Sequence, residues 1–168
     1  MKPVPKCSVL FSFLTLAFFL CFQTDCAAQD KKDKDNTEAE VVNAINNDMW
    51  LVVFDQALPQ KGKTRFLTTE YDVKYSKDTL VVYLPYFGRA YNAPYGETSS
   101  PLDFTSTKFT IEKEKDKKGR WNVTIKPTDN REVQTMYFTF YDNGTASLQV
   151  QMTNRDGIGF NGKMRMKK

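Results

Sequence analysis

The chain contains 168 residues, with 24 basic and 20 acidic side chains and a formal net charge of +4. A weak positive charge that is interspersed with acidic residues argues against a surface built to bind nucleic acid. The sequence has no histidine. This excludes Ser–His catalysis and removes the usual ligands of zinc and haem sites.

The N-terminal segment has the pattern of a secretory signal peptide. Two lysines precede an apolar run over residues 9–22, and Ala28 and Gln29 flank a small-residue cleavage site. We therefore predict a signal peptide over residues 1–28 and export to the periplasm or cell surface. The apolar run is too short to cross a bilayer comfortably, and no later segment is long enough, so we expect no membrane span after the signal is removed.

Cleavage would also remove all three cysteines, which are Cys7, Cys21 and Cys26. The mature chain would then have no thiolate, disulfide or cysteine ligand, and we predict no cofactor and no metal site. A lipid anchor at Cys26 is the alternative to cleavage after Ala28. We disfavour it because Asp25 stands directly before the cysteine, where small residues are expected.

The first predicted elements are a tether and a short helix. Residues 29–36 mix charges without an apolar side chain, which is typical of a disordered segment. Their aspartates do not form a calcium loop, because the required Gly and Glu are replaced by Glu38 and Ala44. Thr37 and Glu40 form a capping-box pattern. An apolar stripe at helical spacing follows, made of Val41, Val42, Ile45 and Met49.

The remainder of the chain reads as strands. Residues 50–54 form an apolar run, and residues 67–75 alternate between apolar and polar side chains. Residues 79–84 are apolar on both faces, so we predict a central strand that Pro85 ends. Alternating segments follow at 109–112 and 121–125.

The last third continues the same pattern. The spacing places Val133, Tyr137 and Tyr141 on one face of a strand, and Met136, Phe138 and Phe140 on the other. Asn143–Gly144 predicts a type I′ hairpin turn. Residues 158–166 predict a terminal strand whose basic face, formed by Lys163, Arg165 and Lys167, would protect an exposed edge.

Short turns between successive strands are typical of an antiparallel meander. The predicted fold is therefore mainly β. We expect about eight strands in a barrel or strongly curved sheet, with one short N-terminal helix and a single domain over residues 37–168.

Two features of the sequence could indicate catalysis. Gly157–Gly162 spells a dinucleotide fingerprint, but the chain ends too soon afterwards for the helix and strand that this chemistry needs. Asp72, Glu97 and Asp103 could serve as paired carboxylates of a hydrolase, although their sequence positions do not pair them. We therefore predict no catalytic residue and regard an enzyme as the least favoured class.

The segment from Tyr83 to about Pro101 differs from the rest of the chain. It is rich in aromatic residues and includes Arg89, which suits stacking on a ligand and binding a carboxylate or phosphate. The same residues could instead pack the loop and cover one end of the barrel. We favour this structural interpretation, because a long loop must pack its own side chains.

The run Tyr83-Leu-Pro-Tyr-Phe-Gly-Arg-Ala-Tyr91, with Ala93-Pro94-Tyr95, resembles the hallmark of an uncharacterised family of exported proteins from Gram-negative gut commensals. The Asn143–Gly144 hairpin and Asn154–Arg155 fit the same pattern. The resemblance implies a domain of unknown function that is often secreted or lipid-anchored, and it assigns no catalytic residue. The candidate residues of the loop are Tyr86, Phe87, Arg89, Tyr91, Tyr95 and Arg155.

These observations leave two main hypotheses for an exported, envelope-associated domain. The first is a module that binds a small molecule, lipid or glycan near residues 85–103. The second is a structural or protein-interaction domain of the envelope, with an unknown partner. An empty interior with Arg89 pointing inward would favour the first hypothesis. A filled interior with Arg89 paired to a carboxylate would favour the second.

Overall fold

The computed structural model describes residues 37–91 and 100–165. The predicted signal peptide, its cleavage site between Ala28 and Gln29, and the tether lie outside the described residues. So do Tyr95, Glu97 and Lys167. The fold below is that of the described part of the chain.

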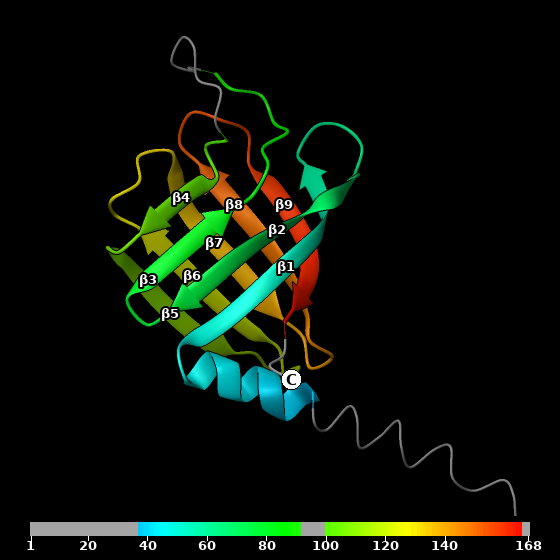
Figure 1. Cartoon of the computed structure of the whole chain (residues 1–168), viewed down its shortest axis with the longest axis vertical. Coiled ribbons are helices and arrows are strands. Elements are labelled where there is room, and N and C mark those ends of the chain that lie inside the picture. Colours follow the sequence, from blue (N-terminus) through cyan, green and yellow to red (C-terminus); the bar gives the residue numbers. More distant parts are fainter. Residues whose placement is uncertain (1–36, 92–99, 166–168) are drawn as a thin grey trace, which may run out of the picture. The chain divides into compact units, whose positions relative to one another are not determined.

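Nine antiparallel strands form one continuous sheet in the order β4-β3-β2-β1-β9-β8-β7-β6-β5 (Figure 1). Their bounds are β1 Met49–Pro59, β2 Arg65–Ser76, β3 Thr79–Tyr83, β4 Asp103–Ser106, β5 Phe109–Lys115, β6 Trp121–Pro127, β7 Val133–Phe140, β8 Thr145–Met152 and β9 Ile158–Met164. Consecutive strands pair with each other except β4 and β5, and β1 also pairs with β9. The predicted mainly β, antiparallel fold is confirmed.

The two ends of the sheet order, β4 and β5, are consecutive in the sequence. The alternating strand directions make β4 and β5 run the same way, so together they act as one strand that bends at Thr107–Lys108 and changes partner from β3 to β6. Asp129 stabilises the bend by accepting hydrogen bonds from the Ser106 hydroxyl at 2.5 Å and the Thr107 amide at 3.0 Å. The bend brings the sheet close to closure, which gives the predicted barrel-like form.

The helix over residues 37–46 covers one end of the barrel (Figure 1). Val41 and Ile45 are buried, as the apolar stripe predicts. Met49 is not part of this stripe, because the helix ends at residue 46 and Asp48 takes a positive φ of 55°. Met49 therefore begins β1 with its side chain exposed. Lys113 of β5 joins the helix to the sheet by donating to the Ile45 carbonyl at 2.6 Å.

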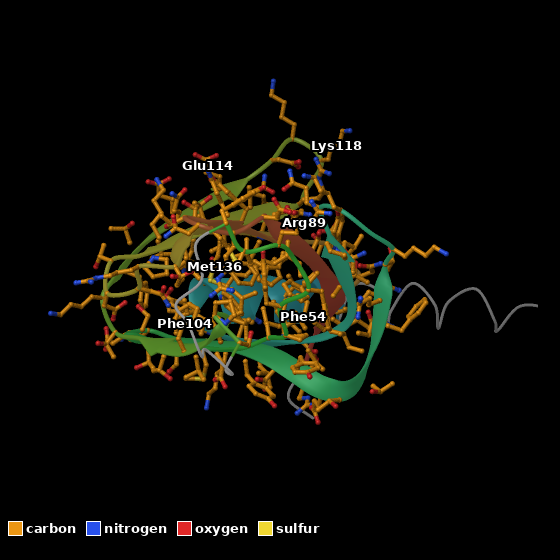
Figure 2. All side chains as sticks on the ribbon, turned by 90° about the horizontal axis from the view of Figure 1, so that it is seen from above. Phe54, Arg89, Phe104, Glu114, Lys118 and Met136 are labelled. Atoms are coloured by element: carbon orange, nitrogen blue, oxygen red, sulfur yellow. The ribbon has the colours of Figure 1, made fainter. Side chains whose placement is uncertain are left out.

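Aromatic side chains from different walls of the barrel meet in its interior. The Trp50 ring of β1 lies 4.9 Å from the Phe138 ring of β7, although two strands separate them in the sheet. Tyr75 of β2 packs against Phe109 of β5 across the bend. Figure 2 looks along the barrel and shows Met136 inside the ring of strands. These contacts fill the interior with the side chains of the chain itself.

Two strands occupy positions that the sequence did not predict. β3 is apolar on both faces but lies next to the last strand of the sheet order, and its outward Val81 and Tyr83 are exposed. β9, whose basic face suggested an edge, is a central strand between β1 and β8. The alternation of basic and apolar residues at its end instead reflects a solvated outer face and a buried inner face. On the outer face, Arg165 just beyond the strand pairs with Glu70.

Two local predictions are corrected in β7 and the turn that follows it. The β7–β8 hairpin forms, but Gly144 has a positive φ of 77° and Asn143 does not, so the turn is not type I′. The Gly144 amide donates to the Tyr141 carbonyl at 3.0 Å, the arrangement of a type I turn followed by a glycine bulge. In addition, the register shifts between Val133 and Thr135, which places Val133 in the core with Met136.

The glycine-rich motif lies in the β8–β9 turn and in β9. A Cβ on Gly162 would fall well inside 3.0 Å of the Val53 carbonyl and of the Phe54 backbone on β1. Gly162 therefore allows the close approach of two strands, and the motif has no nucleotide-binding context.

The fold predicts a simple dependence of stability on pH. Hydrogen bonds to the folded-state carboxylates lower three pKa values: Lys113 acts on Asp48, Arg120 on Asp116 and Ser106 on Asp129. A lowered folded-state pKa adds stability above the unfolded value near 3.8, and this stability is lost as the pH falls through the folded value.

Because the chain has no histidine, we expect a urea midpoint that is constant between about pH 5 and 7 and falls below about pH 4. Urea titrations across this range check the profile, and Asp129→Asn should flatten part of the acid limb. A step in the midpoint between pH 5 and 7 would contradict this prediction.

Candidate functional site

The candidate residues that the structure describes belong to connections at the end of the barrel opposite the helix (Figure 1). Four connections meet there: β1–β2, β3–β4, β6–β7 and β8–β9. Leu84 is buried and its amide donates to the Leu102 carbonyl at 3.0 Å, which fixes the base of the β3–β4 connection. We call this group of connections the loop end.

The first half of the β3–β4 connection is held on the β8–β9 turn by main-chain hydrogen bonds. The Tyr91 amide donates to the Asn154 carbonyl at 2.9 Å, and the Asp156 amide donates to the Arg89 carbonyl at 3.0 Å. These bonds form an isolated antiparallel bridge between Ala90 and Arg155. The loop therefore adds one short ladder to the sheet, and this ladder fixes the backbone of the loop.

The Tyr86 side chain stabilises the same contact between the β3–β4 connection and the β8–β9 turn. Its hydroxyl lies 2.9 Å from the Asp156 carbonyl and 3.0 Å from the Arg89 carbonyl, and it donates its single proton between them. Burial and the nearby Asp156 raise the pKa of Tyr86, so the hydroxyl stays protonated. Gly88 leaves the space for this hydroxyl, because a Cβ at residue 88 would overlap it. Tyr86 is thus a structural residue.

Asp156 is the buried carboxylate of the loop end. Only 5% of the residue is exposed. Its Oδ1 accepts a hydrogen bond from the Tyr91 hydroxyl, which raises the pKa of Tyr91. Its Oδ2 is buried and has no hydrogen-bond donor among the described residues. Sequence analysis did not single out Asp156.

Arg155 and Phe87 also serve the packing of the loop end. The Arg155 side chain is 8% exposed and its Nε donates to Glu132 of the β6–β7 turn at 3.1 Å. Its guanidinium lies 5.6 Å from the centre of the Tyr86 ring. The Arg65 guanidinium covers Phe87 at 4.7 Å. These contacts join three connections and the start of β2, and they support the structural interpretation of the aromatic loop.

Arg89 behaves differently from Arg155. Its residue is exposed, and within residues 37–91 and 100–165 its guanidinium has no side-chain partner. Its positive charge acts on the Tyr91 hydroxyl and opposes the rise in that group's pKa. The view of the loop end in Figure 2 includes Arg89. The guanidinium is thus neither an inward-pointing group nor the carboxylate-paired anchor that the second hypothesis required.

The loop end can bind but offers little chemistry of its own. Arg89 supplies an exposed planar cation, Tyr91 supplies a ring that is 65% exposed, and Asp156 orients the tyrosine hydroxyl. Asp72 and Asp103 lie beside the base of the β3–β4 connection, on either side of Tyr83 in the sheet. Among the described residues, no group of three acidic, histidine or cysteine side chains is placed to hold a metal.

The described part of the chain also contains no helix with the length and apolar character needed to cross a bilayer.

Comparison with known proteins gives a family but no activity. No curated protein matches the chain. The fold is similar to the crystal structure of a DUF4251 family protein from Bacteroides eggerthii, with a TM-score of 0.56 and 16% identity over 77% of this chain and 87% of that chain. Residues 32–164 match the family model described as Domain of unknown function (DUF4251). The chain therefore belongs to the DUF4251 family, whose function is unknown.

Proposed function

We propose that this protein is an exported, envelope-associated binding domain that takes an anionic, hydroxyl-rich ligand, such as an acidic saccharide, at the loop end. The observation that carries the proposal is the pair of exposed side chains, Arg89 and Tyr91, on a backbone that main-chain hydrogen bonds hold in place. A binding group on a rigid segment loses little conformational freedom when a ligand arrives.

The chemistry of the exposed pair suits such a ligand. A guanidinium binds a carboxylate through two parallel hydrogen bonds, and a tyrosine ring stacks on the face of a sugar. Within the described part of the chain, the Oδ2 atom of Asp156 is a buried acceptor without a donor. Leaving such an acceptor unpaired costs free energy, which a ligand hydroxyl that reached it would recover.

The filled interior supports a surface site over an internal one. Trp50, Phe138 and their neighbours occupy the space that a lipid-binding barrel would leave open. The same observation favours the second candidate function, a structural or interaction domain of the envelope. In that case the loop end would bind no small ligand, so a binding experiment separates the two functions.

Export is tested separately from binding. We expect the mature protein to begin at Gln29, because small residues follow the apolar run of the N-terminal segment. Intact-mass spectrometry of protein secreted or released from the periplasm should show the loss of residues 1–28. A diacylated N-terminal Cys26 would contradict cleavage at Ala28 and would indicate a lipoprotein.

Binding is tested with D-glucuronate, and D-glucose serves as the neutral control. The two sugars differ in the carboxylate that we assign to Arg89. We expect glucuronate to bind and Arg89→Gln to weaken its affinity by at least about tenfold, which corresponds to the loss of a charged hydrogen bond. Isothermal titration calorimetry of the purified protein measures the change.

Arg131→Gln is the matched control, because Arg131 is an exposed arginine on the neighbouring β6–β7 turn. It should leave the affinity for glucuronate unchanged. Equal losses in the two variants would indicate general electrostatic attraction and would overturn the assignment of Arg89. Failure of glucuronate to bind would favour the structural or interaction function.

A further inference from the structure

The bridge that holds the β3–β4 connection on the β8–β9 turn decides which side chains share a face. The Asp156 amide donates to the Arg89 carbonyl at 3.0 Å, which places these two residues opposite each other. The Tyr91 amide donates to the Asn154 carbonyl at 2.9 Å and pairs those residues in the same way. Opposite residues of an antiparallel pair point to the same face, and so do alternate residues of one strand. We call the face that these four residues share the ladder face.

The opposite face of the ladder serves the fold. Arg155 alternates with the residues of the ladder face, so its side chain points the other way. There its Nε donates to Glu132 at 3.1 Å, and its guanidinium lies over the Tyr86 ring. Because side chains of the chain itself cover that face, the ladder face is the one that a ligand can use.

The ladder face carries two opposite charges that do not pair with each other. Arg89 and Asp156 are directly opposite, so their Cβ atoms are about 4.5–5.5 Å apart. In the described ranges, the ion pairs include neither residue, and Arg89 is exposed. The Tyr91 hydroxyl donates to Oδ1 of Asp156, while Oδ2 is buried and has no donor in these same ranges. The face therefore offers a cation beside an acceptor oxygen that the fold does not use.

These two groups make different demands on a ligand. A carboxylate alone would satisfy Arg89, but it would bring a second negative charge close to Asp156 and leave Oδ2 unpaired. An acid that also carries a hydroxyl near its carboxylate would satisfy both residues, because the hydroxyl donates to Oδ2. A site with a buried polar group rejects analogues that leave this group unpaired. The pair of residues is therefore suited to discriminate between acids.

We propose that Asp156 is the specificity-determining residue of this site, and that it selects hydroxy acids over acids that have no hydroxyl. The inference rests on the proposed function, because it requires Arg89 to hold the carboxylate of the ligand. A hydroxyl close to that carboxylate donates to Oδ2 of Asp156. Rotation of the exposed Tyr91 side chain admits the hydroxyl, and the main-chain hydrogen bonds of the ladder stay as they are.

The test compares D-glucuronate with cyclohexanecarboxylate, which has a carboxylate on a ring of the same size but no hydroxyl. In isothermal titration calorimetry, we expect the unmodified protein to bind glucuronate at least about tenfold more tightly, which corresponds to one hydrogen bond to a charged group. Asp156→Asn keeps one acceptor oxygen for Tyr91 and replaces the other oxygen by an amide donor. The ratio of the two affinities should then fall to about one.

The same variant separates selection from a purely structural role. Asp156→Asn also removes a negative charge beside Arg89, so cyclohexanecarboxylate should bind no more weakly than before. A purely structural role of Asp156 would weaken both acids alike, and this result would overturn the inference. Asp103→Asn is the matched control, because it makes the same change of charge at an exposed residue of β4 outside the ladder face. It should leave the ratio unchanged.

The outcomes distinguish this inference from the function on which it rests. Equal binding of the two acids by the unmodified protein, or an unchanged ratio in Asp156→Asn, would overturn the selection by Asp156 and leave the anion site at Arg89 in place. Failure of both acids to bind would overturn the inference together with the proposed function. Should Asp156→Asn fail to fold, the two affinities of the unmodified protein still decide.

Discussion

Replacing Arg155 by alanine should lower the free energy of unfolding by about 2–4 kcal/mol, because it leaves a half-buried carboxylate on Glu132 without its cation. The side chain of Arg155 is 8% exposed and also covers the Tyr86 ring. Its loss removes contacts between the β8–β9 turn and both the β6–β7 turn and the β3–β4 connection. Urea unfolding monitored by tryptophan fluorescence measures the change.

Arg89→Ala is the control for this prediction. Arg89 has the same side chain, belongs to the same loop end and is exposed, so its removal should change the free energy of unfolding by only about 0.5 kcal/mol. If Arg89→Ala were as costly as Arg155→Ala, Arg89 would be a structural anchor and the proposed ligand contact would lose its support.

Gly162→Ala should be still more harmful, at roughly 3 kcal/mol or more. The added methyl group would overlap the backbone of Val53 and Phe54 on the neighbouring strand, and backbone in the middle of a sheet has little room to move. The expected result is a large fall in the urea midpoint or a failure to fold, with soluble yield as the second readout.

Gly157→Ala is the matched control, because its Cβ would approach the Val150 carbonyl at 3.2 Å and needs only a small adjustment. We expect a cost below about 1 kcal/mol. Equal stability of the Gly162→Ala variant and the unmodified protein would show that β1 and β9 are not as close as described.

The sequence predicted the elements whose patterning is local. Val41 and Ile45 are buried at helical spacing, and alternating burial in β6 and β8 follows directly from the apolar positions. The Asn143–Gly144 pair predicted the hairpin correctly. It did not determine the turn type, because either a type I′ turn or a bulged type I turn accepts these residues.

Features set by long-range contacts were not predicted. The four residues of β4 are too few to show a period, and their role depends on the bend that brings β5 to β6. The central position of β9 comes from its pairing with β1, a strand some hundred residues earlier in the chain. The exposed outer face of β3 reflects its place beside the short strand β4, which the apolar pattern of β3 does not reveal.

Sequence analysis named candidate residues but did not predict their contacts. Sequence analysis placed Arg89 and Arg155 in one candidate group. The fold distinguishes them, because Arg155 meets a carboxylate 23 residues away in the sequence whereas Arg89 meets solvent. No sequence pattern identified Asp156, since the burial of a carboxylate depends on the loop that covers it.

An NMR titration of the unmodified protein with D-glucuronate and, separately, with D-glucose tests the proposed function most directly. The account predicts that glucuronate shifts the backbone signals of Arg89, Tyr91 and Asn154–Gly157, and that glucose does not. No response to glucuronate would contradict a binding site at the loop end. Shifts confined to interior residues such as Phe54 and Met136 would contradict the filled interior on which that site depends.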